Sequence, residues 1–115
     1  MRNDKENIIV EKTLEFAFLI VDYSELLEEK RKYIIARQIL KSGTSIGANV
    51  REAQNAESKA DFIHKMKIAA KEADETEYWL FLCQNSRHYP DCKELQSKLV
   101  EIIKILSKII SSSKG

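Results

Sequence analysis

Residues 42–82 decide the fold, and they read SGTSIGANVREAQNAESKADFIHKMKIAAKEADETEYWLFL. The second half of this stretch has apolar or small residues at alternating spacings of four and three: Phe62, Met66, Ala69, Ala73, Thr76, Leu80 and Cys83. Such a heptad-like seam is typical of helices packed nearly parallel or antiparallel. Ser58 and Asp61 precede the seam in the S-x-x-D order of a helix start. The pattern predicts a long, packed helix that begins near Ser58.

The first half of the stretch contains two glycines, Gly43 and Gly47. Each costs a helix about 1 kcal/mol relative to alanine. Helical spacing nevertheless continues through them, at Ile35, Ile39, Ser42, Ile46, Val50 and Ala53. We therefore expect a continuous helix whose glycine face lets another backbone approach closely. The alternative, a phosphate-binding loop, lacks the G-x-x-x-x-G-K-[ST] order and a preceding strand.

Three segments in order make the chain recognisable: SGTSIGAN at 42–49, EAQNAESKADFIHK at 52–65 and KEADETEYWL at 71–80. They resemble the signature region of the four-helix-bundle family named for proteins encoded in 23S rRNA intervening sequences. The resemblance implies a bacterial four-helix bundle that assembles as a ring, a pentamer, and no established enzymatic activity. It also implies a relative, the accessory protein of diversity-generating retroelements, which is thought to bind nucleic acid and a reverse transcriptase.

The same resemblance assigns structural roles to the residues of the family motif. These residues are Ser42, Gly43, Ile46, Gly47, Asn49, Tyr78 and Trp79. For the two aromatic residues we favour packing over the stacking of a ligand, because large aromatic side chains dominate cores and interfaces.

The hydrophobic spacing along the whole chain predicts helices at about 8–28, 30–56, 59–86 and 91–110. Long helices with short connections predict an all-α fold, one antiparallel up-down-up-down four-helix bundle that spans residues 1–115. The first helix has two apolar seams, Val10, Leu14, Ala17 and Val21, and Phe16, Ile20, Tyr23 and Leu27. A helix with so wide an apolar surface is buried on more than one side, which predicts a homo-oligomer.

Composition favours a soluble helical protein, with 43% apolar and 32% charged residues. No apolar run approaches the ~20 residues that span a bilayer, so we expect no contact with a membrane. The first residues, MRNDKENIIVEK, carry acidic side chains where a secretory signal would not. We therefore expect a cytoplasmic protein.

Charge provides the one functional lead. The net charge is only +1, but residues 30–51 contain six basic side chains and no acidic one: Lys30, Arg31, Lys32, Arg37, Lys41 and Arg51. We call these six residues the basic block. In an oligomer the block would be repeated, which strengthens weak phosphate contacts through avidity. The competing interpretation is that the block pairs with acids of the first helix near Glu28 and Glu29 and has no function of its own.

No arrangement of residues predicts catalysis, a metal or another cofactor. Asp61 and His64 form a single Asp-x-x-His pair, whereas di-iron bundles need two Glu-x-x-His motifs and two further carboxylates. Cys83, His88 and Cys92 would supply three zinc ligands, one fewer than a structural site needs. A disulfide between the two cysteines is conceivable, although cytosolic thiols are normally reduced.

Two functions remain for a protein that we expect not to be an enzyme. The first is binding of RNA or another structured nucleic acid through the basic block on the second helix. The alternative is a protein–protein scaffold or accessory subunit that uses the surplus apolar surface of the first and third helices and makes no direct contact with nucleic acid.

Overall fold

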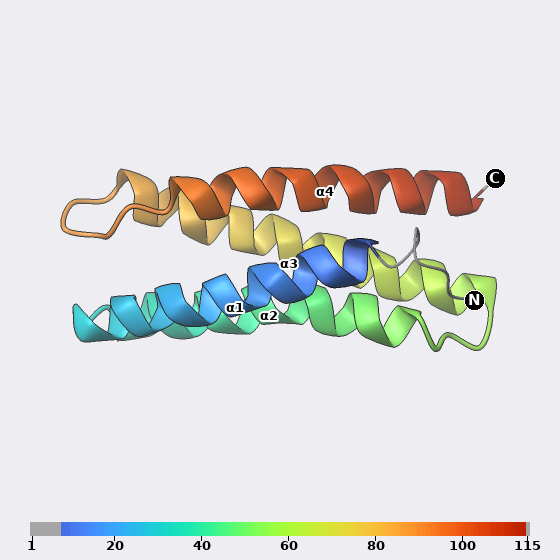
Figure 1. Cartoon of the computed structure of the whole chain (residues 1–115), viewed down its shortest axis with the longest axis horizontal. Helices are drawn as coiled ribbons and strands as arrows, with labels where there is room; N and C mark the ends of the chain where they lie inside the picture. The colour runs from blue at the N-terminus through green and yellow to red at the C-terminus, as the bar shows by residue number, and fades with distance from the viewer. Residues whose placement is uncertain (1–7, 115) are drawn as a thin grey trace.

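Four helices make up residues 8–114, the part of the chain that the computed structural model describes. They are α1 (Ile8–Glu29), α2 (Tyr33–Ala53), α3 (Lys59–Asn85) and α4 (Lys93–Lys114). Each helix runs back along the preceding one in a rod about 45 Å long (Figure 1). The predicted all-α, four-helix fold is confirmed. None of the helices in residues 8–114 combines the length and the apolar character needed to cross a bilayer.

The helix boundaries differ from the prediction by a few residues. α2 begins at Tyr33 rather than Lys30, and it ends at Ala53 because the next three N–H groups each bond to the carbonyl three residues back. α4 begins at Lys93 rather than Asp91. The Asp91 carboxylate instead accepts a hydrogen bond of 2.9 Å from the Gln84 side chain, which fixes the loop before α4. At its other end α4 continues to Lys114, beyond the predicted end near residue 110.

The predicted seams line the core. On α1 the second seam is buried, namely Phe16, Ile20, Tyr23 and Leu27. The first seam is only partly covered, and Leu14 stays 50% exposed. On α3 every predicted seam residue from Met66 to Cys83 is buried, and Phe62 is half-buried. One heptad-like face per helix therefore forms the core, and α1 keeps a second apolar face at the surface.

The two glycines of α2 lie directly against α1. A Cβ on Gly43 would lie 2.8 Å from Cγ1 of Ile20, and one on Gly47 would lie 3.3 Å from the carbonyl oxygen of Thr13. A side chain at Gly43 would require Ile20 to shift, and one at Gly47 would require the α1 backbone to move by a few tenths of an ångström. We call this the glycine contact. It confirms that the glycine face allows close approach of another helix.

The remaining motif residues mostly support α2 and α3. Ile46 is fully buried, and Ser42 accepts a buried hydrogen bond of 2.8 Å from the Thr76 hydroxyl across the α2–α3 interface. The Asn49 amide donates to the Ser45 carbonyl one turn earlier in α2. Trp79 packs against the core, whereas Tyr78 is 58% exposed and contacts the Trp79 ring edge-to-face, so whether it packs in an interface stays a prediction.

The start of α3 follows its sequence signal. The Ser58 hydroxyl accepts a hydrogen bond of 3.0 Å from the Asp61 N–H. The Asp61 carboxylate accepts one of 3.2 Å from the Glu57 N–H, one residue before the position that a standard capping box uses. Two otherwise unpaired backbone donors are satisfied at this end of the bundle.

Candidate nucleic-acid interface

The basic block was predicted to lie on the second helix, but in the structure it is divided between a turn and α2. Lys30, Arg31 and Lys32 form the connection between α1 and α2. Arg37, Lys41 and Arg51 are exposed residues of α2. Arg51 lies 14 residues after Arg37, which at 1.5 Å per residue places it roughly 20 Å further along the helix. The block therefore consists of a cluster at one end of the bundle, continued by Arg37 and Lys41, and a separate arginine towards the other end.

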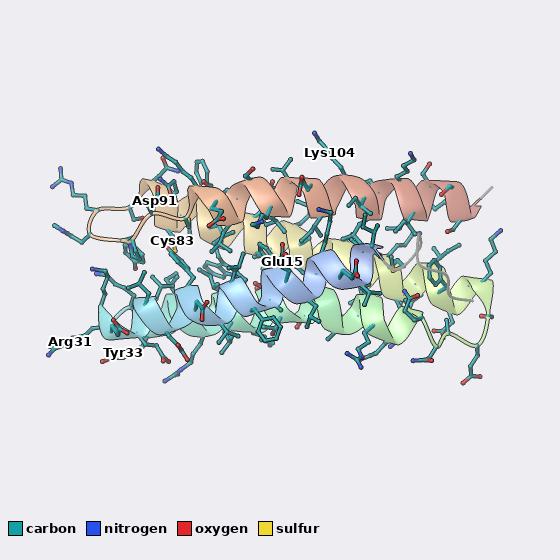
Figure 2. The ribbon with its side chains drawn as sticks, viewed as in Figure 1. Glu15, Arg31, Tyr33, Cys83, Asp91 and Lys104 are labelled. Carbon is teal, nitrogen blue, oxygen red and sulfur yellow. The ribbon has the colours of Figure 1, made fainter. Side chains whose placement is uncertain are left out.

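The turn before α2 has the geometry of a Schellman motif. The Lys32 N–H bonds to the Leu27 carbonyl at 2.8 Å, and the Arg31 N–H bonds to the Glu28 carbonyl at 2.9 Å. Arg31 is left-handed, with φ 64°, at the position where glycine is usual. The motif ends α1 and displaces the start of α2 to Tyr33. Figure 2 shows Arg31 extending beyond the end of the bundle.

The loop between α3 and α4 brings further basic groups to the same end (Figure 1). The two connections meet where the Lys32 ammonium lies 4.8 Å from the centroid of the Tyr89 ring. Arg87 and His88 of this loop are exposed. We call the surface formed by Lys30, Arg31, Lys32 and Arg87 the basic end. Arg87 was not predicted from the sequence as part of this surface, although the first and third connections of an antiparallel bundle necessarily share an end.

No residue of the basic block takes part in an ion pair within residues 8–114. The ion pairs of this part of the chain are Lys12–Glu101, Lys65–Glu52 and Lys98–Glu15, at 3.4, 2.9 and 3.5 Å. Glu28 and Glu29 thus form no ion pair with the neighbouring cations of the basic block in the structure. The interpretation of the block as a set of paired surface charges does not match this arrangement.

A closed apolar layer lies beneath the basic end. Tyr23 donates a hydrogen bond of 2.6 Å to the Pro90 carbonyl, and the Cys92 thiol donates one of 3.3 Å to the Leu80 carbonyl. Burial raises the pKa of Cys83 to about 11 and also raises the pKa values of Tyr23 and Cys92. Both thiols are free, protonated and inaccessible, which argues against a nucleophilic cysteine.

The three sulfur and imidazole groups do not form a metal site in this structure. His88 is exposed in the loop, whereas Cys83 and Cys92 are buried below it. Across residues 8–114 no group of three or more histidine, cysteine, aspartate or glutamate side chains is placed to hold a metal ion. The chemistry of this end is therefore that of exposed cations above an inert apolar layer.

Comparison with known proteins identifies the family. The family model of the 23S rRNA-intervening sequence protein matches residues 5–108, nearly the whole chain. The chain belongs to the 23S rRNA-intervening sequence protein family. It is 46% identical to a protein of unknown function from the S23 ribosomal protein family of Bacteroides thetaiotaomicron, whose crystal structure superposes with a TM-score of 0.84. The similarity covers 90% of this chain and 98% of that one. No curated protein matches the chain.

Membership of the 23S rRNA-intervening sequence protein family agrees with the helical fold, which is shared with the Bacteroides structure. It assigns no activity, because the family name states none and the similar Bacteroides protein is itself of unknown function. The functional argument therefore depends on the surface of this chain.

Proposed function

We propose that this protein is a non-enzymatic helical bundle that binds RNA, or another structured nucleic acid, through the basic end and the adjoining residues Arg37 and Lys41. The observation that carries the proposal is the absence of ion pairs to the basic block within residues 8–114. Cations that are not engaged in ion pairs are available to phosphate groups, and phosphate contacts supply most of the affinity of non-specific nucleic-acid binding.

The net charge of only +1 does not contradict this proposal. Acidic residues are concentrated in the first 29 residues, whereas residues 30–51 contain none. Several copies in one oligomer would present several basic ends to one nucleic acid. Each contact is then weak alone and strengthened by the effective concentration of the others.

The test is a fourfold neutralisation of the block. The variant Lys30→Gln, Arg31→Gln, Lys32→Gln, Arg37→Gln should lose most of its affinity for a structured RNA. If each of the four cations meets one phosphate, the slope of log K against log salt should fall by about 3. The measurement is fluorescence anisotropy with a labelled RNA across a salt series.

A matched control removes the same charge elsewhere. Lys67, Lys71, Lys104 and Lys108 are exposed lysines of α3 and α4. Their replacement by glutamine should lower affinity far less than neutralisation of the block. Equal losses in the two variants would show that only net charge matters. Unchanged binding after neutralisation of the block would remove the basis of the proposal.

A second candidate, a protein scaffold or accessory subunit, is favoured by exposed apolar surface. On α1, Phe18 is 65% exposed next to the exposed Leu14. A groove of about 480 Å³ between α3 and α4 is lined in part by Tyr78 and Phe81. Contiguous apolar surface of this kind typically marks an interface. Sedimentation of the protein as a monodisperse monomer at micromolar concentration would contradict the oligomeric part of this candidate.

A further inference from the structure

A pocket beside the basic end combines positive charge with exposed aromatic and apolar surface. It has a volume of about 260 Å³ and is lined by Arg31, Lys32, Tyr33, Ile34, Ile35 and Tyr89. Tyr33 is 51% exposed and Ile34 is 75% exposed. They are the first two residues of α2 and directly follow the turn of Lys30, Arg31 and Lys32. Figure 2 shows Tyr33 at the same end of the bundle as Arg31.

The two tyrosines of the pocket are not equivalent. The Lys32 ammonium lies over one face of the Tyr89 ring, 4.8 Å from its centroid, which holds the positive charge at the rim of the pocket. Within residues 8–114 the Tyr33 ring has neither an aromatic partner nor a cation over its face. The pocket therefore presents one free aromatic face next to a fixed cation and to Arg31.

We propose that this pocket binds an unpaired nucleotide of the RNA, with the base stacked on Tyr33 and the flanking phosphates beside Arg31 and Lys32. The inference rests on the proposed function and specifies the form of nucleic acid that the basic end prefers. Paired bases keep their faces stacked inside the helix, and only unpaired bases offer a face to an aromatic side chain. Phosphates alone would leave Tyr33 and Ile34 without a partner.

Charge selects a nucleotide over a neutral apolar ligand at this pocket. Arg31 and Lys32 line it, and neither belongs to an ion pair in the described part of the chain. An acidic, apolar segment of another protein is the competing class of ligand, since it offers both kinds of contact. The two classes differ in their response to the structure of an RNA probe.

The experiment compares two labelled RNAs with the same stem, a hairpin with an unpaired loop and a blunt duplex. Wild-type protein should bind the hairpin more tightly, on the order of tenfold, since one base–aromatic stack contributes about that much. Tyr33→Leu should remove this preference and leave duplex binding unchanged. Tyr33→Phe, which keeps the ring, should retain the preference. Tyr78→Leu is the matched control, because Tyr78 is a similarly exposed tyrosine on α3.

The outcomes separate this inference from the proposed function. If the protein binds hairpin and duplex equally and Tyr33→Leu changes nothing, the pocket does not read unpaired bases, while RNA binding through the basic end stands. If Tyr33→Leu weakens both RNAs equally, Tyr33 is a general contact and the inference is wrong. If the wild type binds neither RNA at low salt, both proposals fall, and the acidic protein ligand becomes the explanation of the pocket. A thermal melt of each variant verifies that it is folded.

Discussion

The glycine contact in the middle of the bundle and the basic end differ in what limits a side chain. At the glycine contact an added methyl group on Gly43 would lie 2.8 Å from Ile20, so the close fit between α1 and α2 disfavours any residue larger than glycine. At the basic end Arg31 has open space around it but a left-handed backbone, with φ 64°. Close packing limits the side chains at the glycine contact, whereas a strained backbone and unpaired charges characterise the basic end.

The difference indicates which region serves stability and which serves binding. Close packing in the middle stabilises the fold directly. A non-glycine residue in the left-handed region costs about 1–2 kcal/mol, and unpaired surface cations contribute little to stability. Features that cost stability tend to gather at functional sites. Three experiments test this division, beginning with the one that should have the largest effect.

Alkaline pH should destabilise the protein through the layer beneath the basic end. Burial raises the pKa of Cys83 from 9.0 to about 11. The unfolded chain therefore loses this proton at lower pH than the folded chain does. The stabilisation is fully present below pH 9 and is lost as the pH rises through 11. We expect a fall of about 2 kcal/mol in the free energy of unfolding by the upper end of this range, measured by urea titration.

Cys83→Ala isolates the contribution of this thiol from the titration of lysines and of Tyr23. The variant should lose less stability between the two pH values than the parent does. Equal pH dependence in the two proteins would show that the thiol is already solvated in the folded state, and that the layer beneath the basic end is open.

Gly43→Ala tests the glycine contact. The new Cβ would meet Cγ1 and Cγ2 of Ile20, at 2.8 and 2.9 Å, and these atoms cannot swing away because a β-branched side chain is stiff at χ1. Overpacking typically costs 1–3 kcal/mol, and the gain in helix propensity offsets about 1 kcal/mol of it. We expect a net loss of about 1 kcal/mol in denaturant unfolding and unchanged affinity for RNA per folded molecule.

The control for Gly43→Ala is the same substitution in an Ile20→Ala background. Without the isoleucine the added methyl group has room, so it should be neutral or stabilising there. If Gly43→Ala stabilises the parent protein, the close packing of α1 and α2 does not require a glycine at this position. Tight packing would then not distinguish the glycine contact from the basic end.

The parts of the fold that the sequence predicted are those with a local signal. The α3 seam, the Ser58 cap and the glycine contact each follow from spacings within one helix or around its start. The partly exposed first seam of α1 was also visible as an excess of apolar residues. The sequence alone does not decide whether Leu14 and Phe18 are covered by another copy or by another protein.

The basic end was only partly predictable, for two physical reasons. The usual sign of a helix end, a glycine after the last turn, is replaced by Arg31, so the sequence contained no signal that α2 starts as late as Tyr33. Arg87 and Tyr89 lie close to the connection between α1 and α2 because of the arrangement of the helices, and no local spacing in the sequence indicates this. The pocket at Tyr33 is likewise formed by two segments that lie far apart in the sequence, the turn and first residues of α2 and the loop that contains Tyr89.

Arg31→Gly should have the smallest effect on stability and should change stability and binding in opposite directions. Glycine relieves about 1–2 kcal/mol of strain in the left-handed conformation. The variant also loses a favourable charge at the end of α1, worth about 0.3–1 kcal/mol, and gains entropy in the unfolded chain. The net expectation is a stabilisation of about 0.5 kcal/mol. Loss of one phosphate contact should lower the slope of log K against log salt by about 0.7 to 0.9.

His88→Gly provides the comparison that makes this test specific. His88 also has a left-handed backbone, with φ 67°, and lies in the other loop of the same end. Its replacement relieves strain without removing an arginine, so stability should rise and RNA affinity should stay unchanged. If Arg31→Gly stabilises the protein and binds RNA as well as the parent does, Arg31 makes no contact with the RNA, and its strained backbone does not mark a binding site.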